Sequence, residues 1–224
     1  MTKNIHHGAQ GDGVAAIILA AGRSQRMGAF KPLLPFGATT VVDSCIEHLS
    51  AGGVQTVVVV LGHRAEELRE HLRDSGALFA VNPDPDGEMS SSIASGVRAL
   101  PQQAKAVIIA PVDQPAVPSE IVTQLLDEWK KGHLLVKPTW EGRGGHPVVV
   151  DLSFRDELLH LDPNRGLKAL FGSHADQVKR LAVDSTYIAR DLDTWDDYAA
   201  LHREVFGVPP EVPASKAKAP QAKA

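Results

Sequence analysis

Three short runs of uninterrupted apolar residues constrain the fold of this chain more than any other feature of its sequence. They occupy residues 14–20 (VAAIILA), 56–61 (TVVVVL) and 106–110 (AVIIA). A strand with one face in water alternates apolar and polar residues, whereas a strand covered on both faces lacks polar positions, as these runs do. Segments with helical periodicity separate them. The sequence therefore predicts an α/β fold with a mainly parallel sheet flanked by helices.

The other expected elements continue this alternation. Helical patterns cover residues 39–50, 65–73, 90–100, 119–130, 153–161, 165–172 and 194–205. Further strands are expected at residues 78–81, 134–136, 147–150 and 177–183. The strands at 134–136 and 147–150 surround a Gly-rich turn and break the strand–helix rhythm, so they can add antiparallel pairing. Ligands of such sheets bind outside the carboxyl ends of the strands, which directs attention to the loops after residues 20 and 110.

Length and composition limit the domain organisation. With 224 residues, 43% of them hydrophobic, the chain can bury one full core, and we expect a single domain over residues 13–206. Residues 1–12 and the Pro/Ala/Lys-rich residues 207–224 offer few large apolar groups and are expected to be disordered. The single cysteine, Cys45, excludes a disulfide framework and multi-cysteine metal sites, and we expect it to be a packed side chain.

Composition also excludes several kinds of partner. No apolar run approaches the roughly 20 residues of a membrane span, and the start of the chain lacks the apolar core of a secretory signal. We therefore expect a cytoplasmic protein without membrane contacts. A net charge of −4 and an aromatic content of 5% argue against a nucleic-acid surface.

The loop after the first strand carries the strongest signal of a binding site. Its glycines, Gly22 and Gly28, let the backbone approach a ligand closely. Its cations, Arg23, Arg26 and Lys31, have no acidic residue near them in the sequence. Exposed amides and several cations at the end of a strand suit a polyphosphate. The alternative interpretation is a basic surface turn.

Two familiar phosphate-binding loops do not fit this segment. The P-loop requires Gly-Lys-Ser/Thr, whereas this loop reads Phe30-Lys31-Pro32. The dinucleotide-binding fingerprint requires glycines after the first strand, and the Gly11-x-Gly13 pair precedes it. A plain dinucleotide-binding module is therefore disfavoured.

The segment LAAGRSQRMGAFK (residues 19–31) resembles the nucleotide-binding signature of the MobA-like nucleotidyltransferases, and most of all that of the molybdenum cofactor cytidylyltransferases. The resemblance implies a fold similar to that of the sugar-phosphate nucleotidyltransferases, which is Rossmann-like. In that family Leu-Ala-Ala-Gly accompanies CTP, and guanylyl-transferring relatives have Leu-Ala-Gly-Gly, so residues 19–22 imply CTP. The resemblance also implies that Arg23 and Arg26 hold the β- and γ-phosphates and that Lys31 lies between the acceptor and the α-phosphate. The nucleotide-binding residues implied are Leu19, Ala20, Ala21, Gly22, Arg23, Ser24, Arg26, Met27, Gly28, Lys31, Asn82, Ser92 and Gly96.

Acidic residues after two later segments are candidate Mg²⁺ ligands. Asp113 follows the buried strand at 106–110, and carboxylates are ligands that Mg²⁺ prefers. It matches the family's metal-binding Asp-x-Pro motif, although an aspartate that caps a turn is the alternative. Asp191 and Asp193 resemble the start of the family's Asp-x-Asp-Thr-Pro-Glu-Asp segment, and we favour Asp193 as the second ligand. Alternatively, Asp193 or Thr194 caps the last helix; Trp195 replaces the family's usual proline.

Two further segments complete the predicted site. In related cytidylyltransferases a serine at the start of the helix at 90–100 contacts cytosine, and this role falls best on Ser92, with Asn82 a weaker candidate. Helix capping explains one of the three serines at residues 90–92 equally well. The Gly-His-Pro sequence at residues 145–147 resembles the family element over the acceptor pocket, so Arg143, Gly145 and His146 are candidate acceptor contacts. A hairpin turn with an exposed histidine is the alternative.

The resulting hypothesis is a Mg²⁺-dependent cytidylyltransferase. The resemblance implies that CMP is transferred from CTP to the terminal phosphate of Mo-molybdopterin, with release of pyrophosphate, for delivery to a molybdoenzyme apoprotein. A different phosphate acceptor, such as a sugar phosphate or an alcohol phosphate, remains open. A non-catalytic carrier that inserts the finished molybdenum cofactor is the alternative from another class.

Overall fold

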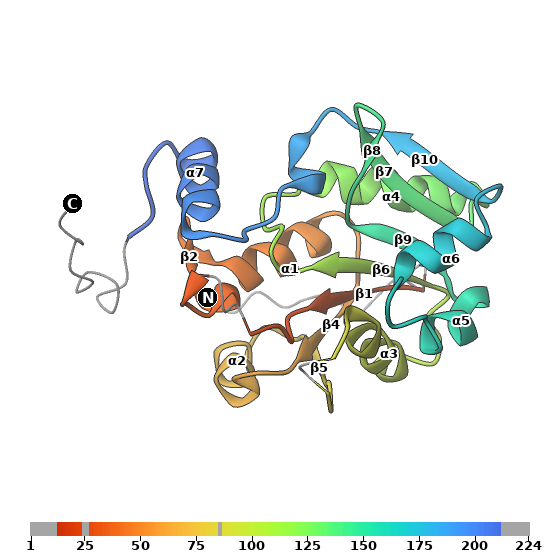
Figure 1. Cartoon of the computed structure of the whole chain (residues 1–224), viewed down its shortest axis with the longest axis horizontal. Coiled ribbons are helices and arrows are strands. Elements are labelled where there is room, and N and C mark those ends of the chain that lie inside the picture. The colour runs from red at the N-terminus through yellow and green to blue at the C-terminus, as the bar shows by residue number, and fades with distance from the viewer. Residues whose placement is uncertain (1–12, 24–26, 85–86, 212–224) are drawn as a thin grey trace, which may run out of the picture.

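One mixed sheet forms the centre of the molecule (Figure 1). The structure, a computed structural model, describes residues 13–23, 27–84 and 87–211, so the predicted disordered start and most of the predicted tail lie outside the described residues. The sheet has the order β10-β7-β9-β6-β1-β4-β5, with β8 paired to β7. Its strands are β1 (Val14–Leu19), β4 (Thr56–Leu61), β5 (Leu78–Val81), β6 (Ala106–Pro111), β7 (Leu135–Trp140), β8 (Arg143–Gly144), β9 (Val148–Asp151) and β10 (Val178–Ala182).

Most neighbouring strands of this sheet are parallel, as the apolar runs predict. β1 lies between β4 and β6 and pairs with both in parallel, and β4–β5 and β7–β10 are also parallel. β9 runs antiparallel to β6 and β7, and β8 antiparallel to β7. The predicted α/β fold, a single domain with a mainly parallel sheet and antiparallel pairing from the segment around residues 134–150, is confirmed.

Helices cover both faces of the sheet. They are α1 (Val41–Ala51), α2 (Ala65–His71), α3 (Met89–Ala99), α4 (Ser119–Lys130), α5 (Arg155–Leu159), α6 (Leu167–Ser173) and α7 (Trp195–Phe206). The described residues also form the 3-10 helices η2 (Lys31–Leu33), η3 (Leu152–Phe154) and η4 (Thr186–Ala189) and the hairpin of β2 (Pro35–Phe36) and β3 (Thr39–Thr40). In the part of the chain that the structure describes, no helix is long and apolar enough to cross a membrane.

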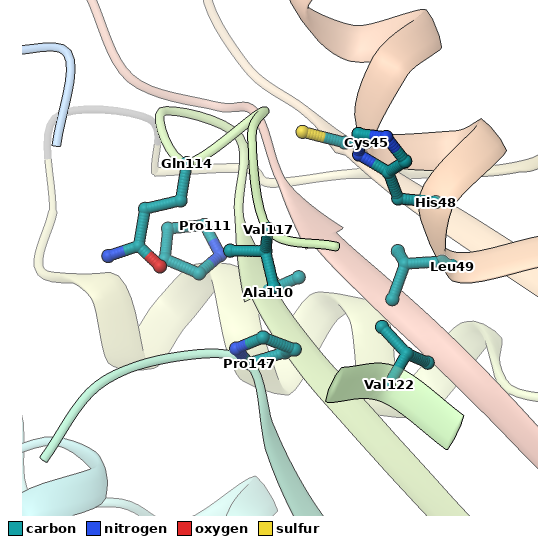
Figure 2. Close-up of a pocket in the computed structure, with 9 residues that line it drawn as sticks. All are labelled: Cys45, His48, Leu49, Ala110, Pro111, Gln114, Val117, Val122 and Pro147. Carbon is teal, nitrogen blue, oxygen red and sulfur yellow. The ribbon is translucent and has the colours of Figure 1, made fainter. Parts of the chain in front are cut away.

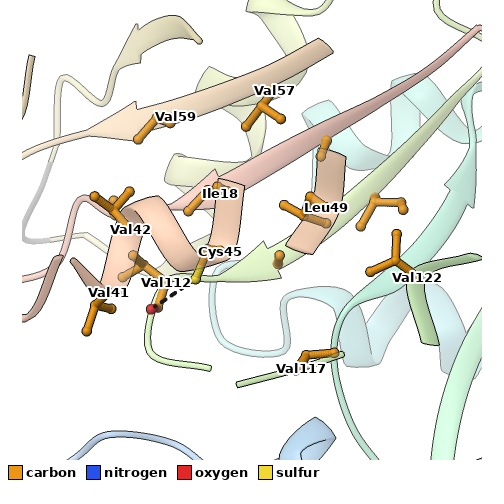
Figure 3. Close-up of a cluster of buried hydrophobic side chains, with 14 of the residues drawn as sticks. Ile18, Val41, Val42, Cys45, Leu49, Val57, Val59, Val112, Val117 and Val122 are labelled. Carbon is orange, nitrogen blue, oxygen red and sulfur yellow. Dashed lines mark hydrogen bonds between the residues drawn. The ribbon is translucent and has the colours of Figure 1, made fainter. Parts of the chain in front are cut away.

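Alternating side chains of the strands separate the core into two clusters. Ala16 and Ile18 of β1 belong to the cluster that contains side chains of α1, α2, α4 and α7. Ala15 and Ile17 belong to the other cluster, with side chains of α3, α5 and α6. Figure 3 shows Ile18 beside Cys45 of α1, whose thiol donates to the Val112 carbonyl at 3.5 Å. Because β1 is buried on both faces, it carries no polar residue.

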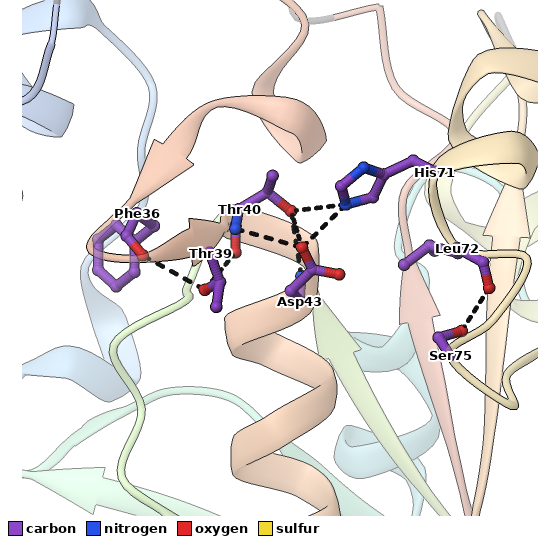
Figure 4. Close-up of polar contacts among 7 residues, drawn as sticks. All are labelled: Phe36, Thr39, Thr40, Asp43, His71, Leu72 and Ser75. Atoms are coloured by element: carbon purple, nitrogen blue, oxygen red, sulfur yellow. Dashed lines mark hydrogen bonds and ion pairs between the residues drawn. The ribbon is translucent and has the colours of Figure 1, made fainter. Parts of the chain in front are cut away.

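The start of α1 is fixed by a capping box. Thr40 is the N-cap, and its side chain accepts from the Asp43 amide while the Asp43 carboxylate accepts from the Thr40 amide. The same carboxylate lies 2.8 Å from His71 Nε2 at the end of α2 (Figure 4). The cap therefore also joins α2 to α1, and it fixes the hairpin and η2 that precede it.

Candidate active site

A cavity of about 220 Å³ opens where β1 and β6 end, at the carboxyl edge of the sheet. Leu19 lines it from the end of β1, Ala20, Ala21 and Gly22 line it from the loop after β1, and Ser92 lines it from α3. The remaining lining residues are Lys31, Pro32, Met89, Pro111, Val112 and Asp113. Six of the residues predicted to bind the nucleotide, and the predicted metal ligand Asp113, therefore surround one cavity.

Lys31 lies between two of the predicted metal ligands. Its ammonium nitrogen is 3.2 Å from Asp193 Oδ1 and 3.5 Å from Asp113 Oδ2. The Lys31 side chain is only 12% exposed, against 26% for Asp113 and 43% for Asp193. Pro32 stands at the start of η2, a position where its missing amide hydrogen costs no bond, and it helps to hold Lys31 there. Two carboxylates 80 residues apart thus converge on one cationic group.

Burial and nearby charges together shift the pKa of Asp113. Burial raises the pKa of Asp113, the nearby Asp191 and Asp193 carboxylates raise it further, and Lys31 opposes them. Within residues 13–23, 27–84 and 87–211, no three His, Cys, Asp or Glu side chains are arranged to hold a metal ion by themselves. Two carboxylates are nevertheless the number that Mg²⁺ commonly takes from a protein when substrate phosphates complete its coordination.

Asp191 and Asp193 have different surroundings. The Gln114 side-chain amide donates to Asp191 Oδ1 at 2.7 Å, and the Leu192 amide donates to the Asp113 carbonyl at 2.9 Å. Neither aspartate caps α7, because Thr194 is the N-cap and forms a capping box with Asp197. The alternative in which Asp193 caps α7 is therefore wrong, and the Thr194 alternative is confirmed. This capping box defines the helix start where Trp195 replaces the family's usual proline.

Asn82 positions two serines at the start of α3. Its side-chain amide donates to Ser91 Oγ and to Ser92 Oγ, each at 2.9 Å, and its carbonyl accepts from the Asp84 amide at 3.0 Å. Asn82 and Ser92 are both buried, but of the two only Ser92 lines the cavity. Glu88 is the N-cap of α3 and makes no side-chain bond, so Ser92 does not cap this helix.

Several predicted nucleotide-binding residues lie away from the cavity lining. Gly96 packs on the sheet, where an added Cβ would come within 2.7 Å of Ile17 and 3.0 Å of Val60. Met27 is buried in the core, and Gly28 adopts a positive φ of 62° that favours glycine. These three residues shape the loop and its support.

The predicted phosphate-binding arginines are described only in part. Ser24 and Arg26 lie outside the described residues. The Arg23 guanidinium donates to His63 Nε2 at 2.9 Å, next to the turn after β4. That turn touches the predicted loop directly, since a Cβ on Gly62 would collide with the Ala21 carbonyl and come within 2.7 Å of the Ala21 side chain.

The predicted acceptor residues lie beside η4. The His146 amide donates to the Ile188 carbonyl at 2.7 Å, and a Cβ on Gly145 would collide with that carbonyl. Burial lowers the pKa of His146, and the Lys137 cation lowers it further, whereas a hydrogen bond with the Ile109 backbone and Asp191 raise it. His146 is partly buried, with a buried Nδ1, rather than exposed in a hairpin turn, and Arg143 is exposed in β8. Asp191 therefore lies within electrostatic reach of both His146 and Asp113.

A second, much smaller cavity lies behind Gln114. It has a volume of about 20 Å³, and Figure 2 shows Cys45, His48 and Leu49 of α1 on one side of it and Gln114 on the other. Burial raises the pKa of the Cys45 thiol far above its usual range, as expected of a packed side chain.

Among the described residues, Gln114 Oε1 and His146 Nδ1 are buried without a hydrogen-bond partner. The role of Gln114 depends on a contact 77 residues away, which no local sequence signal reveals.

The fold is that of a nucleotidyltransferase, and the cavity lies at the carboxyl edge of its sheet. Residues 16–178 match the MobA-like NTP transferase domain family, and the chain belongs to that family.

Known proteins with different activities are similar to the chain. A molybdenum cofactor cytidylyltransferase from Escherichia coli is 26% identical over 188 residues, which cover 83% of this chain and 93% of that protein. A nicotine blue oxidoreductase from Paenarthrobacter nicotinovorans is 32% identical over 150 residues, 63% of this chain and 72% of that protein. The crystal structure of Rv0371c from Mycobacterium tuberculosis has a TM-score of 0.76 at 27% identity, and covers 85% of this chain and 97% of that one. Another structure of that protein is a complex with manganese, with a TM-score of 0.73 at 26% identity, covering 85% of this chain and 98% of that one.

Proposed function

We propose that this nucleotidyltransferase uses CTP and transfers CMP to the terminal phosphate of Mo-molybdopterin, with release of pyrophosphate. The observation that carries the proposal is the position of Lys31, whose ammonium lies within 3.5 Å of both Asp113 and Asp193 at the cavity. Two carboxylates can hold a divalent metal whose coordination substrate phosphates complete, and the Lys31 ammonium beside them can contact the same phosphates. The similarity to a molybdenum cofactor cytidylyltransferase supports the acceptor.

The chain's own residues supply positioning and positive charge. An acceptor phosphate oxygen forms a bond to the α-phosphorus of CTP as the bond from that phosphorus to the β-phosphate oxygen breaks. Lys31 stabilises the charge that develops on the α-phosphoryl oxygens, and Arg23, with Arg26, holds the β- and γ-phosphates. A phosphate acceptor is already ionised near neutral pH, so the reaction requires no general base.

Asp113 and Asp193 are the residues that would hold Mg²⁺. Their carboxylates converge on one cationic group, and Asp191 adds a third negative charge near Asp113, which favours a divalent cation. When bound by these two residues, the metal would supply Lewis-acid polarisation of the phosphoryl oxygens. Asp191 is the poorer candidate because the Gln114 amide already donates to its Oδ1.

The choice of CTP rests on residues 19–22, which read Leu-Ala-Ala-Gly, and on the similarity to a cytidylyltransferase, and Ser92 is the residue proposed to contact the base. Asn82 donates to Ser92 Oγ, so the Ser92 hydroxyl hydrogen can be donated to an acceptor atom on the base. The Ala21 side chain lines the cavity and also lies close to Gly62. Its methyl group therefore fills space between the loop after β1 and the turn after β4.

Thermal-shift titrations with CTP, GTP and ATP in Mg²⁺ test the nucleotide. Selective stabilisation by CTP is expected, and Lys31→Ala should abolish most of it. Selective stabilisation by GTP would contradict the assignment of cytosine as the base. No stabilisation by any of the three nucleotides would contradict the nucleotide site.

Pyrophosphate release from CTP tests the acceptor and the reaction. Release should depend on Mo-molybdopterin, and Lys31→Ala should lower kcat by about 10²- to 10³-fold, as loss of one preorganised donor does. Pyrophosphate release with a sugar phosphate or an alcohol phosphate, and not with Mo-molybdopterin, would show that the acceptor is that other phosphate compound. Tight binding of the finished cofactor without any release would favour a carrier, and reduction of a dye without CTP would favour an oxidoreductase like the similar relative.

A further inference from the structure

Lys137 and Arg180 form a pair of like charges on the sheet. Lys137 of β7 lies directly opposite Arg180 of β10, and Leu135 lies opposite Val178 two residues earlier. Leu135 and Val178 belong to the cluster on the face of α3, α5 and α6. Since side chains two residues apart on a strand share a face, Lys137 and Arg180 lie on this face too. Like charges on neighbouring strands repel each other.

Lys168 adds a third cation to this pair. It lies on α6, whose Leu170 packs in the same cluster as Leu135. Burial lowers the pKa of Lys137, and the Arg180 and Lys168 cations lower it further. We call Lys137, Lys168 and Arg180 the cation cluster. In the described ranges none of these three residues forms an ion pair, so no carboxylate there compensates the repulsion.

The Lys137 side chain extends toward the predicted acceptor residues. A Cβ on Gly144 would collide with Lys137 Cε and lie 2.5 Å from its Nζ, so the Lys137 side chain packs against Gly144 of β8. Gly144 pairs with Thr139, closer to the carboxyl end of β7, and precedes Gly145 and His146. The Lys137 cation also lies within electrostatic reach of His146. The cation cluster therefore borders the acceptor side of the candidate active site.

We propose that Lys137, Lys168 and Arg180 bind a second anionic group of the acceptor substrate, remote from the phosphate that attacks CTP. The inference rests on the proposed function for its choice of substrate. Phosphate, carboxylate and metal-oxo groups share the required chemistry, because each presents several negative oxygens to converging cations. The cluster selects acceptors with two separated anionic groups and holds the far end while the near phosphate reaches Lys31.

Lysine-selective NMR of the full chain, labelled with ¹³C-lysine, tests the cation cluster without any turnover. Inorganic phosphate is the probe, and replacement of Lys137, Lys168, Lys31 and Lys105 by methionine in turn assigns their signals. We expect saturable shifts of the Lys137 and Lys168 signals, and Arg180→Met should weaken phosphate binding at Lys137 about 10-fold or more. Lys105 precedes β6 at the opposite edge of the sheet and is the matched control, so its signal should not saturate.

The outcomes separate this inference from the proposed function. Shifts of Lys137 and Lys168 that grow linearly with phosphate, as those of an exposed lysine do, would overturn the cation cluster. The Lys31 signal reports separately on CTP with Mg²⁺, so its failure to respond would contradict the nucleotide site alone.

Kinetics with Mo-molybdopterin then test whether the anion belongs to the acceptor. Lys137→Met should raise the KM for the acceptor about 10-fold or more and leave the KM for CTP unchanged, while Lys105→Met should change neither. An unchanged acceptor KM in Lys137→Met, or equal increases for both substrates, would overturn the assignment to the acceptor.

Discussion

Asp113→Asn is expected to make the ligand-free protein more stable while it removes activity. Burial and two neighbouring carboxylates raise the pKa of Asp113 in the folded state, and Lys31 only partly opposes them. A carboxyl whose folded pKa lies above its unfolded pKa favours the folded state when it is protonated. Its contribution to the free energy of unfolding is therefore fully present below the unfolded pKa of about 4. That stability is lost as the pH rises through the folded pKa. At pH 7 the ionised Asp113 side chain therefore lowers the free energy of unfolding. Asparagine has nearly the same size and no charge, so it removes this cost.

The size of this effect follows from the surroundings of Asp113. Its carboxylate has two like charges and one cation nearby, and its 26% exposure allows water to screen part of the repulsion. Relief of strain at a functional site of this kind is typically worth about 1 kcal/mol. For a domain of this length, that free energy corresponds to an increase in Tm of about 2–4 °C.

Calorimetric unfolding of the wild type and Asp113→Asn at pH 7 and pH 4 measures the effect. The variant should have the higher Tm at pH 7, and its advantage should shrink at pH 4, where the wild-type carboxyl gains its proton. Asp74→Asn is the control, because the Asp74 side chain is 89% exposed and lies away from the cavity. A variant less stable than the wild type at pH 7, or an advantage that is equal at both pH values, would refute the reasoning.

Further substitutions test other parts of the site. In Mg²⁺ titrations of turnover, Asp193→Asn should require about 10-fold more metal or fail to saturate, and Asp191→Asn should require little more; equal effects would contradict the assignment of Asp193. Gly145→Ala should lower the free energy of unfolding by about 1–3 kcal/mol in urea titrations, because its Cβ collides with the Ile188 carbonyl, and unchanged stability would argue against that close packing. Thr194→Ala should cost about 1 kcal/mol through loss of the α7 cap, measured in the same way, and a neutral effect would mean that another group caps the helix.

Sequence patterns predict the fold well where burial alone decides the conformation. The run at residues 56–61 coincides with β4, and the pattern at 119–130 coincides with α4, since a fully covered strand and an amphipathic helix leave clear periodicities. The strand expected at 134–136 instead extends to Trp140 as β7, beyond Lys137 and Pro138. A proline cannot donate to the strand ladder and is a typical strand breaker, but the Pro138 carbonyl accepts from the Gly145 amide and the strand continues.

The candidate site is predictable only where its residues are close in sequence. The loop after β1 and the aspartate after β6 meet because parallel strands end at one edge, which the pattern of strands already implies. The bond between Gln114 and Asp191 and the packing of Gly96 on Ile17 depend on tertiary contacts. The like-charge pair of Lys137 and Arg180 depends on strand register, which the sequence of either strand alone does not encode.

A crystal structure of the complex with Mg²⁺ and a non-hydrolysable CTP analogue tests the central claim most directly. The account predicts a triphosphate against residues 20–23 and Lys31, the cytosine beside Ser92, and a metal ion held by Asp113 and Asp193. A nucleotide bound elsewhere, or a cavity at the end of β1 that stays empty at saturating analogue, would contradict it.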